Sequence, residues 1–432
     1  MRAPWSGRLP YSGKVGDSVI DRPKLRPVEV VRAKVSERPV YLLRDASRLT
    51  ESAVTVSEDI LYVLRFFDGR HSPLDIRSEY MRKFGGFLFE EQLDEIVQKL
   101  ESSLLLEGET FDRHMKGLKD EFARSDARAS SHAGTAYPSD PDELTSMLDE
   151  FFTHSEGPGA PLSGPGDAEA PRGLVLPHID IRAGGPCTAW GYSELSKGKL
   201  PDVYVILGTG HSGPENNFAV TRKDFLTPLG RATTDVSFVD SVLEACETDF
   251  TAGELAHKAE HSVEFQVVFL QYLYEKLGVD GAGPRIVPVL CSFGFGDVQP
   301  EAPGDASSRI EEFTSALRGA SKRSGASVCF LASADLAHLG PRYGDPRGIE
   351  GPQLNVVRSK DLEMLGAVER GSAEELAAII AQERDSRHVC GFSPIYTMLK
   401  AMEPTSGRLL KYSYTPVDNA GSIVSFAGMA LE

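Results

Sequence analysis

Three apolar runs, each of which predicts a buried β-strand, are followed by side chains that could do chemistry. Two of the runs are followed by histidine, and the third is followed by a carboxylate and then a histidine. The residues concerned are His178 after residues 174–176, His211 after residues 203–207, and Asp335 and His338 after residues 328–331. Imidazole is a good ligand for iron, copper and zinc, whereas hard cations prefer sites made mainly of oxygen atoms. These four side chains therefore predict a metal site or a catalytic site.

Each residue by itself also has a structural explanation, because a single histidine at a strand end is more often a hydrogen-bonded loop residue than a ligand. The recurrence at three strand ends, each next to glycine or another small residue, favours a metal or catalytic site instead. Gly208-Thr209-Gly210 before His211 alternatively fits a phosphate-binding loop. The Lys-Ser/Thr pair that would complete a P-loop does not follow it, so this signal is weak.

Two further motifs lie at the starts of predicted helices. In Glu260-His261-Ser262-Val263-Glu264, the residues His261 and Glu264 are three positions apart and share one side of the helix. They are candidates for a catalytic base and the carboxylate that orients it, unless the motif serves only as a helix cap.

Cys390 comes directly before a second predicted helix. A helix N-terminus lowers the pKa of a thiol and favours the thiolate, which is the form that binds metals or attacks substrates. A buried structural cysteine is the alternative.

Strand-like runs alternate with helical stretches over the last 260 or so residues, as is typical of α/β proteins. The runs span residues 174–176, 203–207, 286–290, 328–331 and 423–426. This alternation predicts βα units on a mostly parallel sheet. Ligands of such sheets bind beyond the carboxyl ends of the strands, which is where His178, His211 and Asp335 are placed.

The first 131 residues have a different organisation. Residues 1–27 are rich in Gly, Pro and Arg and predict a flexible or loosely docked arm. Residues 28–111 combine strand-like segments, three amphipathic helices and a short apolar pair at 105–106, a pattern typical of a small winged-helix domain. Residues 112–131 are polar and predict a linker helix or a hinge, so the α/β domain is expected at 132–432.

Composition narrows the classes of function. Lys and Arg total 46 against 63 Asp and Glu, for a net charge of −17, which disfavours a general nucleic-acid-binding protein. The third helix of the winged-helix pattern, residues 89–104, is itself acidic. Five cysteines indicate a reducing compartment rather than a disulfide framework. Without a signal peptide or an apolar run of the roughly 20 residues that a membrane span needs, we expect a cytoplasmic protein with no membrane contact.

Five motifs, in their order and spacing, resemble the Memo family, whose bacterial and archaeal members are often called AmmeMemoRadiSam system protein B. They are Leu176-Pro177-His178, Leu207-Gly208-Thr209-Gly210-His211, Glu260-His261-Ser262-Val263-Glu264, Ser333-Ala334-Asp335-Leu336-Ala337-His338 and Cys390-Gly391-x-x-Pro394-Ile395. The resemblance implies the LigB-like fold of class III non-haem iron extradiol dioxygenases. It also implies that His178, His211 and Cys390 are metal ligands, with Asp335 and His338 beside them as acid/base or outer groups.

The extradiol dioxygenases have a carboxylate as their third ligand, so a thiolate at Cys390 changes the redox chemistry, and ring cleavage does not follow from the fold. The resemblance implies a redox enzyme with non-haem iron or copper, zinc being the less suitable metal. It further implies a radical-SAM protein and an AMMECR-type protein as partners, and a peptide or a small molecule as substrate.

The N-terminal segment resembles the PqqD-like family in residues 63–69, Val-Leu-Arg-Phe-Phe-Asp-Gly, and in the helix 89–104. Members of that family generally bind a peptide along a strand edge and present it to an enzyme, although a docking or dimerisation module is the alternative here. Two other functions remain open for the whole chain. One is a metal-dependent hydrolase that uses Asp335 or His338 as base, and the other is a non-enzymatic peptide-binding or adaptor protein with a vestigial site.

Overall fold

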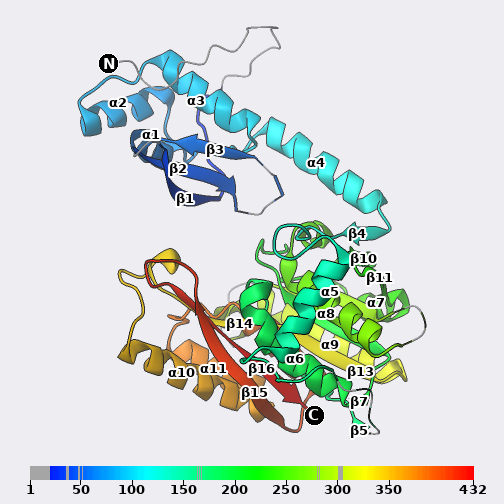
Figure 1. The fold of residues 1–432 in the computed structure, drawn as a ribbon. Coiled ribbons are helices and arrows are strands. Elements are labelled where there is room, and N and C mark those ends of the chain that lie inside the picture. The colour runs from blue at the N-terminus through cyan, green and yellow to red at the C-terminus, as the bar shows by residue number, and fades with distance from the viewer. Residues whose placement is uncertain are drawn as a thin grey trace. The chain divides into compact units, whose positions relative to one another are not determined.

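The computed structural model describes residues 20–432 except for residues 36–37, 47–48, 51, 163, 165, 167, 280, 282 and 300–304. The chain divides into two compact units, Met1–Leu118 and Lys119–Glu432. Each unit has its own sheet and its own apolar core, and each is described by itself (Figure 1).

The smaller unit combines a three-stranded antiparallel sheet with short helices. Its elements are β1 (Val28–Val35), β2 (Arg38–Asp45), β3 (Ala53–Val56), α1 (Glu58–Val63), η1 (Leu64–Phe66), α2 (Pro73–Phe84) and α3 (Glu90–Ser102). This order agrees with the pattern predicted for residues 28–111. Where a wing strand was predicted, Leu106 makes a single bridge to Leu25. The winged-helix assignment of this unit therefore stays a prediction.

The predicted N-terminal arm is partly docked on this unit. The backbone N–H of Arg26 donates to the Leu105 carbonyl at 2.9 Å, and the Arg26 guanidinium pairs with Asp45 at 3.1 Å in a buried ion pair. A buried arginine needs such a partner, and these two contacts attach residues near Arg26 to the smaller unit. Residues 1–19 of the predicted arm lie outside the described residues.

The segment 112–131, predicted as a linker, is mostly helical. Helix α4 (Glu109–Arg124) covers its first part, and the division between the two units falls within this helix. Strand β4 (Ala127–Ala129) then pairs in parallel with β10 (Asp224–Thr227) of the larger unit. The linker helix that was one of the two predictions for this segment is thus present over residues 112–124, as its polar residues of good helix propensity favour.

The larger unit is built on an 11-stranded sheet. Its centre is a set of parallel strands, in the order β6 (Gly173–Leu176), β13 (Val328–Ser333), β8 (Val203–Thr209), β12 (Arg285–Cys291) and β11 (Gly230–Thr234). The predicted α/β fold with a mostly parallel sheet is therefore confirmed.

Antiparallel strands flank this parallel centre. On one side lie β16 (Ile423–Leu431), β15 (Gly407–Pro416) and β14 (Asp335–Leu339), and on the other β10, with β9 (Phe218–Val220) paired to β12. The run predicted at 423–426 is thus a longer strand, antiparallel to its neighbours, because a short hairpin from β15 leads into it.

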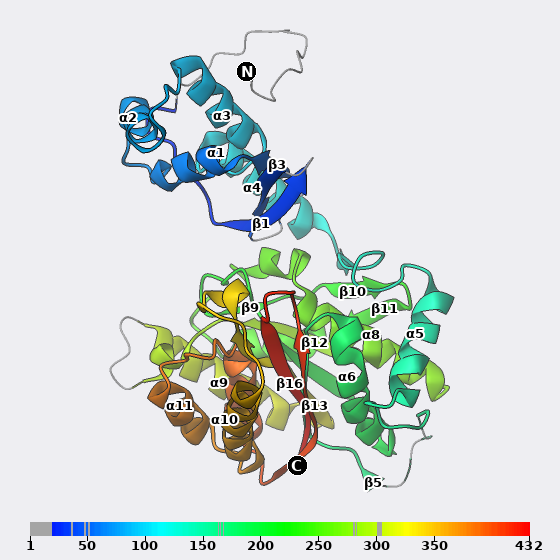
Figure 2. The same ribbon diagram turned by 60° about the vertical axis from the view of Figure 1, so that its left-hand side comes forward.

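Helices cover both faces of the sheet, as Figure 2 shows. One face packs against α5 (Pro141–Thr153), α6 (Ile181–Ser196) and α8 (His261–Lys276), and the other against α7 (Val236–Leu243), α9 (Ala306–Arg323), α10 (Pro352–Glu369), α11 (Ala373–Gln382) and α12 (Phe392–Met402). Along β8, Val203 and Val205 belong to one core, while Tyr204 and Ile206 belong to the other. This alternation is what a strand buried on both faces requires.

Within the part of the chain that the structure describes, no helix combines the length and the apolar character that a membrane span needs.

Candidate metal centre

His178 lies just beyond the carboxyl end of β6 and is 2% exposed. Its Nδ1 is 2.8 Å from the Ser333 carbonyl oxygen, which only accepts, so Nδ1 carries the hydrogen and the Nε2 lone pair is available. This Nε2 is 3.4 Å from Cys390 Sγ and 3.6 Å from Asp335 Oδ2. Burial lowers the pKa of His178 to about 4 in spite of Asp335, so the ring is neutral, as a metal ligand must be.

His211 follows β8 through a tight loop, and its side chain is 43% exposed. A Cβ at Gly208 would lie 2.5 Å from Ser262 Oγ, so only glycine allows β8 to approach α8 this closely. The backbone N–H of His211 donates to Glu260 at 3.0 Å, and Nδ1 of its ring is 3.1 Å from both carboxylate oxygens of Glu260. The loop and the carboxylate together fix the ring and leave its Nε2 available.

Glu260 is the N-cap of α8, and it is the site residue that sequence reasoning passed over in favour of Glu264. Its carboxylate accepts from the backbone N–H groups of His261 and Ser262 at 2.9 and 3.1 Å, and lies 3.1 Å from Nδ1 of His261. Burial alone would raise the pKa of Glu260, but the hydrogen bonds from His211 and His261 hold it well below its usual range. The sequence did carry a signal for Glu260, because a carboxylate at the start of a predicted helix directly precedes a histidine there.

Glu264 is fully buried and lies outside the groups of side chains that the structure brings together as potential metal ligands among the described residues. It forms an ion pair with Arg128, and it accepts from the Tyr137 hydroxyl and from the backbone N–H of His132. These partners hold the pKa of Glu264 below its usual range although burial acts in the opposite direction. The structure thus places Glu264 in a structural network instead of beside the His261 ring.

His261 does join the site. Its ring stacks on that of His211, with centroids 5.0 Å apart and planes 17° apart, and lies 5.4 Å from the His178 ring. His211, Glu260 and His261 form one of the groups whose ligand atoms lie within 4.8 Å of one another. His132, a residue the sequence did not single out, borders His261 at a centroid distance of 5.6 Å.

Cys390 lies directly before α12, at the end of a segment that packs against β14. A Cβ at the next residue, Gly391, would lie 2.3 Å from the Asp335 carbonyl oxygen, so glycine is needed for this approach. Burial and the nearby Asp335 carboxylate raise the pKa of the Cys390 thiol well above its usual range. In the protein alone, burial and the Asp335 charge thus oppose the effect of the helix N-terminus, which was expected to favour the thiolate. A bound cation would reverse this balance, because metal coordination deprotonates a thiol.

Asp335 and His338, both on β14, complete the group. Asp335 Oδ1 accepts from the backbone N–H groups of His178 and Ile179 at 3.0 and 3.2 Å, so the carboxylate positions the segment that carries His178. His338 Nδ1 is 3.0 Å from the Leu336 carbonyl, and burial lowers the pKa of its ring. Ligand atoms of Asp335, His338 and Cys390 lie within 4.8 Å of one another.

The segment before Cys390 has an unusual backbone. Arg384, Asp385 and His388 have φ angles of 52°, 48° and 50°, in the left-handed region that costs of order 1 kcal/mol or more for non-glycine residues. Arg387, between them, is buried and pairs with Asp361 and with Glu383. This ion pair network holds the strained segment in place.

The donor set fits a first-row transition metal. His178, His211 and Cys390 offer two imidazole nitrogens and one sulfur within 4.8 Å of one another. Bonds of about 2.1 Å to nitrogen and 2.3 Å to sulfur at a tetrahedral centre would separate the two ligand atoms by about 3.6 Å. The observed distance of 3.4 Å between His178 Nε2 and Cys390 Sγ is close to that value.

These features define an α/β protein whose sheet carries a mixed histidine and cysteine site at the carboxyl edge of its parallel strands. Residues 128–430 match a family model described as Memo-like protein. Because the match covers well over half of the chain, the chain belongs to the Memo family, and the predicted resemblance is confirmed.

Several curated relatives are described as MEMO1 family proteins. The one from Methanopyrus kandleri is 31% identical over 70% of this chain and 97% of its own length, and the one from Aeropyrum pernix is 32% identical over 66% and 92%. The one from Aquifex aeolicus is 25% identical over 90% of this chain and 95% of its own length. That last match is longer than the family model, so it includes part of the smaller unit.

Proposed function

We propose that this protein is a metal-dependent redox enzyme that holds one non-haem iron or copper ion with His178, His211 and Cys390. The observation that supports the proposal is the convergence of these three ligands, from three distant segments, to within 4.8 Å of one another. Two imidazoles and one thiolate suit copper, iron or zinc, and three protein ligands leave coordination positions open. Iron or copper, unlike zinc, would supply redox chemistry at this position.

His338 and His261 would serve as proton donors and acceptors beside the ion. In each ring a hydrogen bond at Nδ1, to the Leu336 carbonyl and to Glu260 respectively, leaves Nε2 available. Burial lowers the pKa of His338 and keeps its ring neutral, which is the form that accepts a proton near neutral pH. Asp335, which fixes the backbone at His178, would act mainly by positioning.

We further propose that the substrate is a peptide or a small molecule and that a radical-SAM protein and an AMMECR-type protein act with this chain. The resemblance to AmmeMemoRadiSam proteins supports these partners. The peptide is supported by β1, which lies at an edge of the β1-β2-β3 sheet and is mostly exposed, as an added peptide strand requires. Co-expression with such partners, followed by size-exclusion chromatography, tests this extension.

Metal analysis of anaerobically purified protein tests the main proposal. We expect about one iron or copper ion per chain, and loss of that metal in Cys390→Ala. Cys246→Ala is the matched control, because Cys246 is also a free, partly exposed cysteine but lies outside the groups of candidate ligands. It should keep the metal.

Other outcomes would overturn the proposal. Failure to bind any metal under any condition would exclude a metal enzyme. Tight zinc binding with ester or amide hydrolysis and no oxygen consumption would establish a hydrolase instead. Capture of a peptide ligand that is unaffected by replacing His178 and His211 would establish a binding protein.

A further inference from the structure

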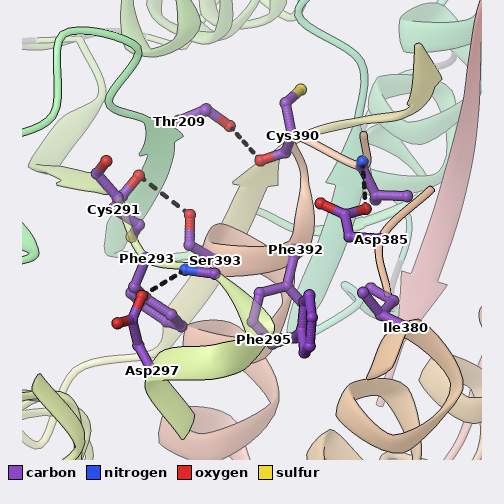
Figure 3. A pocket seen from close by; sticks show the side chains of 13 residues that line it. Thr209, Cys291, Phe293, Phe295, Asp297, Ile380, Asp385, Cys390, Phe392 and Ser393 are labelled. Carbon is purple, nitrogen blue, oxygen red and sulfur yellow. Dashed lines mark hydrogen bonds between the residues drawn. The ribbon is translucent and has the colours of Figure 1, made fainter. Parts of the chain in front are cut away.

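A cavity of about 370 Å³ lies beside the metal centre and borders Thr209 and Cys390. Cavities of roughly 300–1,000 Å³ are typical of small-molecule sites. The Thr209 hydroxyl donates to the Cys390 carbonyl at 3.3 Å, which ties the two walls together. Figure 3 shows the Cys390 sulfur pointing away from the phenylalanine side chains that line the cavity. Among the described residues that line the cavity, Cys390 is the one candidate ligand, because neither His178 nor His211 borders it.

Aromatic and aliphatic side chains form one part of the wall of this cavity, while polar groups make up the larger part of its accessible surface. Phe293, Phe295, Phe392 and Ile380 line it. Phe293 and Phe392 meet edge to face, with ring centroids 5.9 Å apart. Phe392 and Ile380 are buried and belong to the core of the larger unit, so this side of the cavity is rigid. This aromatic part of the wall can pack against an apolar or aromatic body in a ligand.

Of the lining residues that the structure describes, the charged ones are Asp297 and Asp385, and none is a lysine or an arginine. Asp297 Oδ2 accepts from the backbone N–H of Gly294 at 2.8 Å, and Asp385 Oδ1 accepts from that of Val389 at 2.9 Å. These hydrogen bonds fix both carboxylates and engage one oxygen of each. In the view of Figure 3 the two carboxylates lie on opposite sides of the phenylalanine rings. A cavity that combines aromatic rings on one part of its wall with fixed negative charge attracts a cation.

We propose that this cavity is a binding site, separate from the metal centre, for a small ligand that carries an ammonium group on an apolar or aromatic body. The ammonium would donate to Asp385 or Asp297, and the body would lie against Phe392 and Phe293. Because Asp385 belongs to the strained segment that leads into Cys390, an occupant of this site contacts the same backbone that positions the thiol.

Calorimetric titration of the full chain with three probes of similar size tests the proposal. The probes are phenethylamine, 2-phenylethanol and 3-phenylpropionate, which carry positive, zero and negative charge. Chelator-treated protein is used so that the amine has no metal to bind. We expect phenethylamine to bind at least roughly tenfold more tightly than 2-phenylethanol, because a charge-assisted hydrogen bond is lost in the neutral probe.

Substitution then assigns the carboxylates. Asp385→Asn and Asp297→Asn keep an oxygen for the backbone N–H of Val389 or Gly294, so the local turns are retained. At least one of the two should weaken phenethylamine binding roughly tenfold without changing the affinity for 2-phenylethanol. Asp249→Asn is the matched control, because Asp249 also accepts from a nearby backbone N–H, that of Thr251, but does not line the cavity. It should bind as the wild type does.

The outcomes separate this proposal from the proposed function. Phenethylamine binding that persists in His178→Ala would support the cavity even if no metal were found. Equal affinity for the three probes, tighter binding of 3-phenylpropionate, or unchanged amine binding in both carboxylate variants would overturn it. Loss of amine binding in His178→Ala but in neither carboxylate variant would also overturn it, since the amine would then bind at the metal centre.

Discussion

At the scale of single residues, Glu260 connects two histidines of the candidate metal centre. Its carboxylate interacts with the ring nitrogens of both His211 and His261 and with the backbone N–H of each. A carboxylate that orients a ligating histidine also increases the basicity of that ring. Glu260 therefore controls the geometry and the donor strength of His211 without being one of the three proposed ligands.

We predict that Glu260→Gln lowers metal affinity roughly 10- to 100-fold, because a neutral amide cannot accept from both rings as a carboxylate does. Competitive metal titration against a coloured chelator measures the change. Glu264→Gln is the comparison: it disrupts the buried pair with Arg128 and should cost about 3 kcal/mol of unfolding free energy while leaving the metal affinity of the folded protein unchanged. Equal losses of affinity in the two variants would contradict the assignment.

The sequence predicted part of this site and missed part for identifiable reasons. His178, His211, Asp335 and His338 were predictable because strand ends of a parallel sheet meet at one edge. Helical spacing paired His261 with Glu264, but spacing does not reveal that a buried Arg128 from a distant strand takes up that carboxylate. The high pKa of the thiol likewise depends on burial and on a neighbouring charge from another segment, neither of which is visible in local sequence.

At the scale of elements, the segment that leads into α12 connects the metal centre to the rest of the larger unit. Arg387 is buried between Glu383 and Asp361, and its carbonyl accepts from the backbone N–H of His338 at 2.7 Å. The segment therefore positions His338 as well as Cys390. The three left-handed residues beside Arg387 persist because these interactions offset their strain.

We predict that Arg387→Leu lowers the free energy of unfolding by about 3–5 kcal/mol at neutral pH, because it leaves the buried Asp361 carboxylate without its partner. Arg370→Leu, which breaks an exposed pair with Glu375, should cost at most about 1 kcal/mol. Urea unfolding compares the two variants. It is followed by the fluorescence of Trp190, which lies in the larger unit, in chains whose Trp5 is replaced by phenylalanine. A similar small loss in both variants would show that the buried pair is not stabilising.

Some strands of the larger sheet are easier to predict from the sequence than others. The apolar runs of β6, β8, β12 and β13 are buried on both faces and therefore stand out from the sequence. The hairpin of β15 and β16 was only half predicted, because β15 is partly exposed and its residues do not form an apolar run. The left-handed backbone at Arg384, Asp385 and His388 carries no glycine that would have indicated it.

At the scale of the whole molecule, buried histidines make the stability of the larger unit depend on pH. His257 is 1% exposed, and its Nε2 is 3.0 Å from the Ala219 carbonyl. Burial is the main cause that lowers the pKa of His257 from 6.5 to about 4. Below pH 6.5 the unfolded chain therefore takes up a proton that the folded chain does not, and the free energy of unfolding falls as the pH falls.

The variant His257→Gln can still donate a hydrogen bond to Ala219. We predict that between pH 6.5 and pH 4 its free energy of unfolding falls by about 3 kcal/mol less than that of the wild type. Urea unfolding at a series of pH values measures the difference between variant and wild type. Parallel pH profiles would contradict the prediction.

The division of the chain into two units predicts that the larger unit folds by itself. The relative from Methanopyrus kandleri matches over 97% of its length but only 70% of this chain, so a chain corresponding mainly to the larger unit exists on its own. A fragment of residues 119–432 should therefore fold and bind the same amount of iron or copper per chain as the full protein. Loss of metal in a fragment that keeps a cooperative unfolding transition would show that the smaller unit contributes to the centre.

We propose that one metal ion is bound by two imidazoles and the sulfur of Cys390. X-ray absorption at the K-edge of the bound iron or copper tests it most directly, because sulfur and nitrogen scatter at distinct distances, near 2.3 and 2.1 Å respectively. We predict one sulfur and at least two nitrogen neighbours in the wild type, with the sulfur contribution absent in Cys390→Ser and retained in Cys246→Ser. A metal with no sulfur neighbour in the wild type, or a sulfur contribution that survives in Cys390→Ser, would contradict the claim.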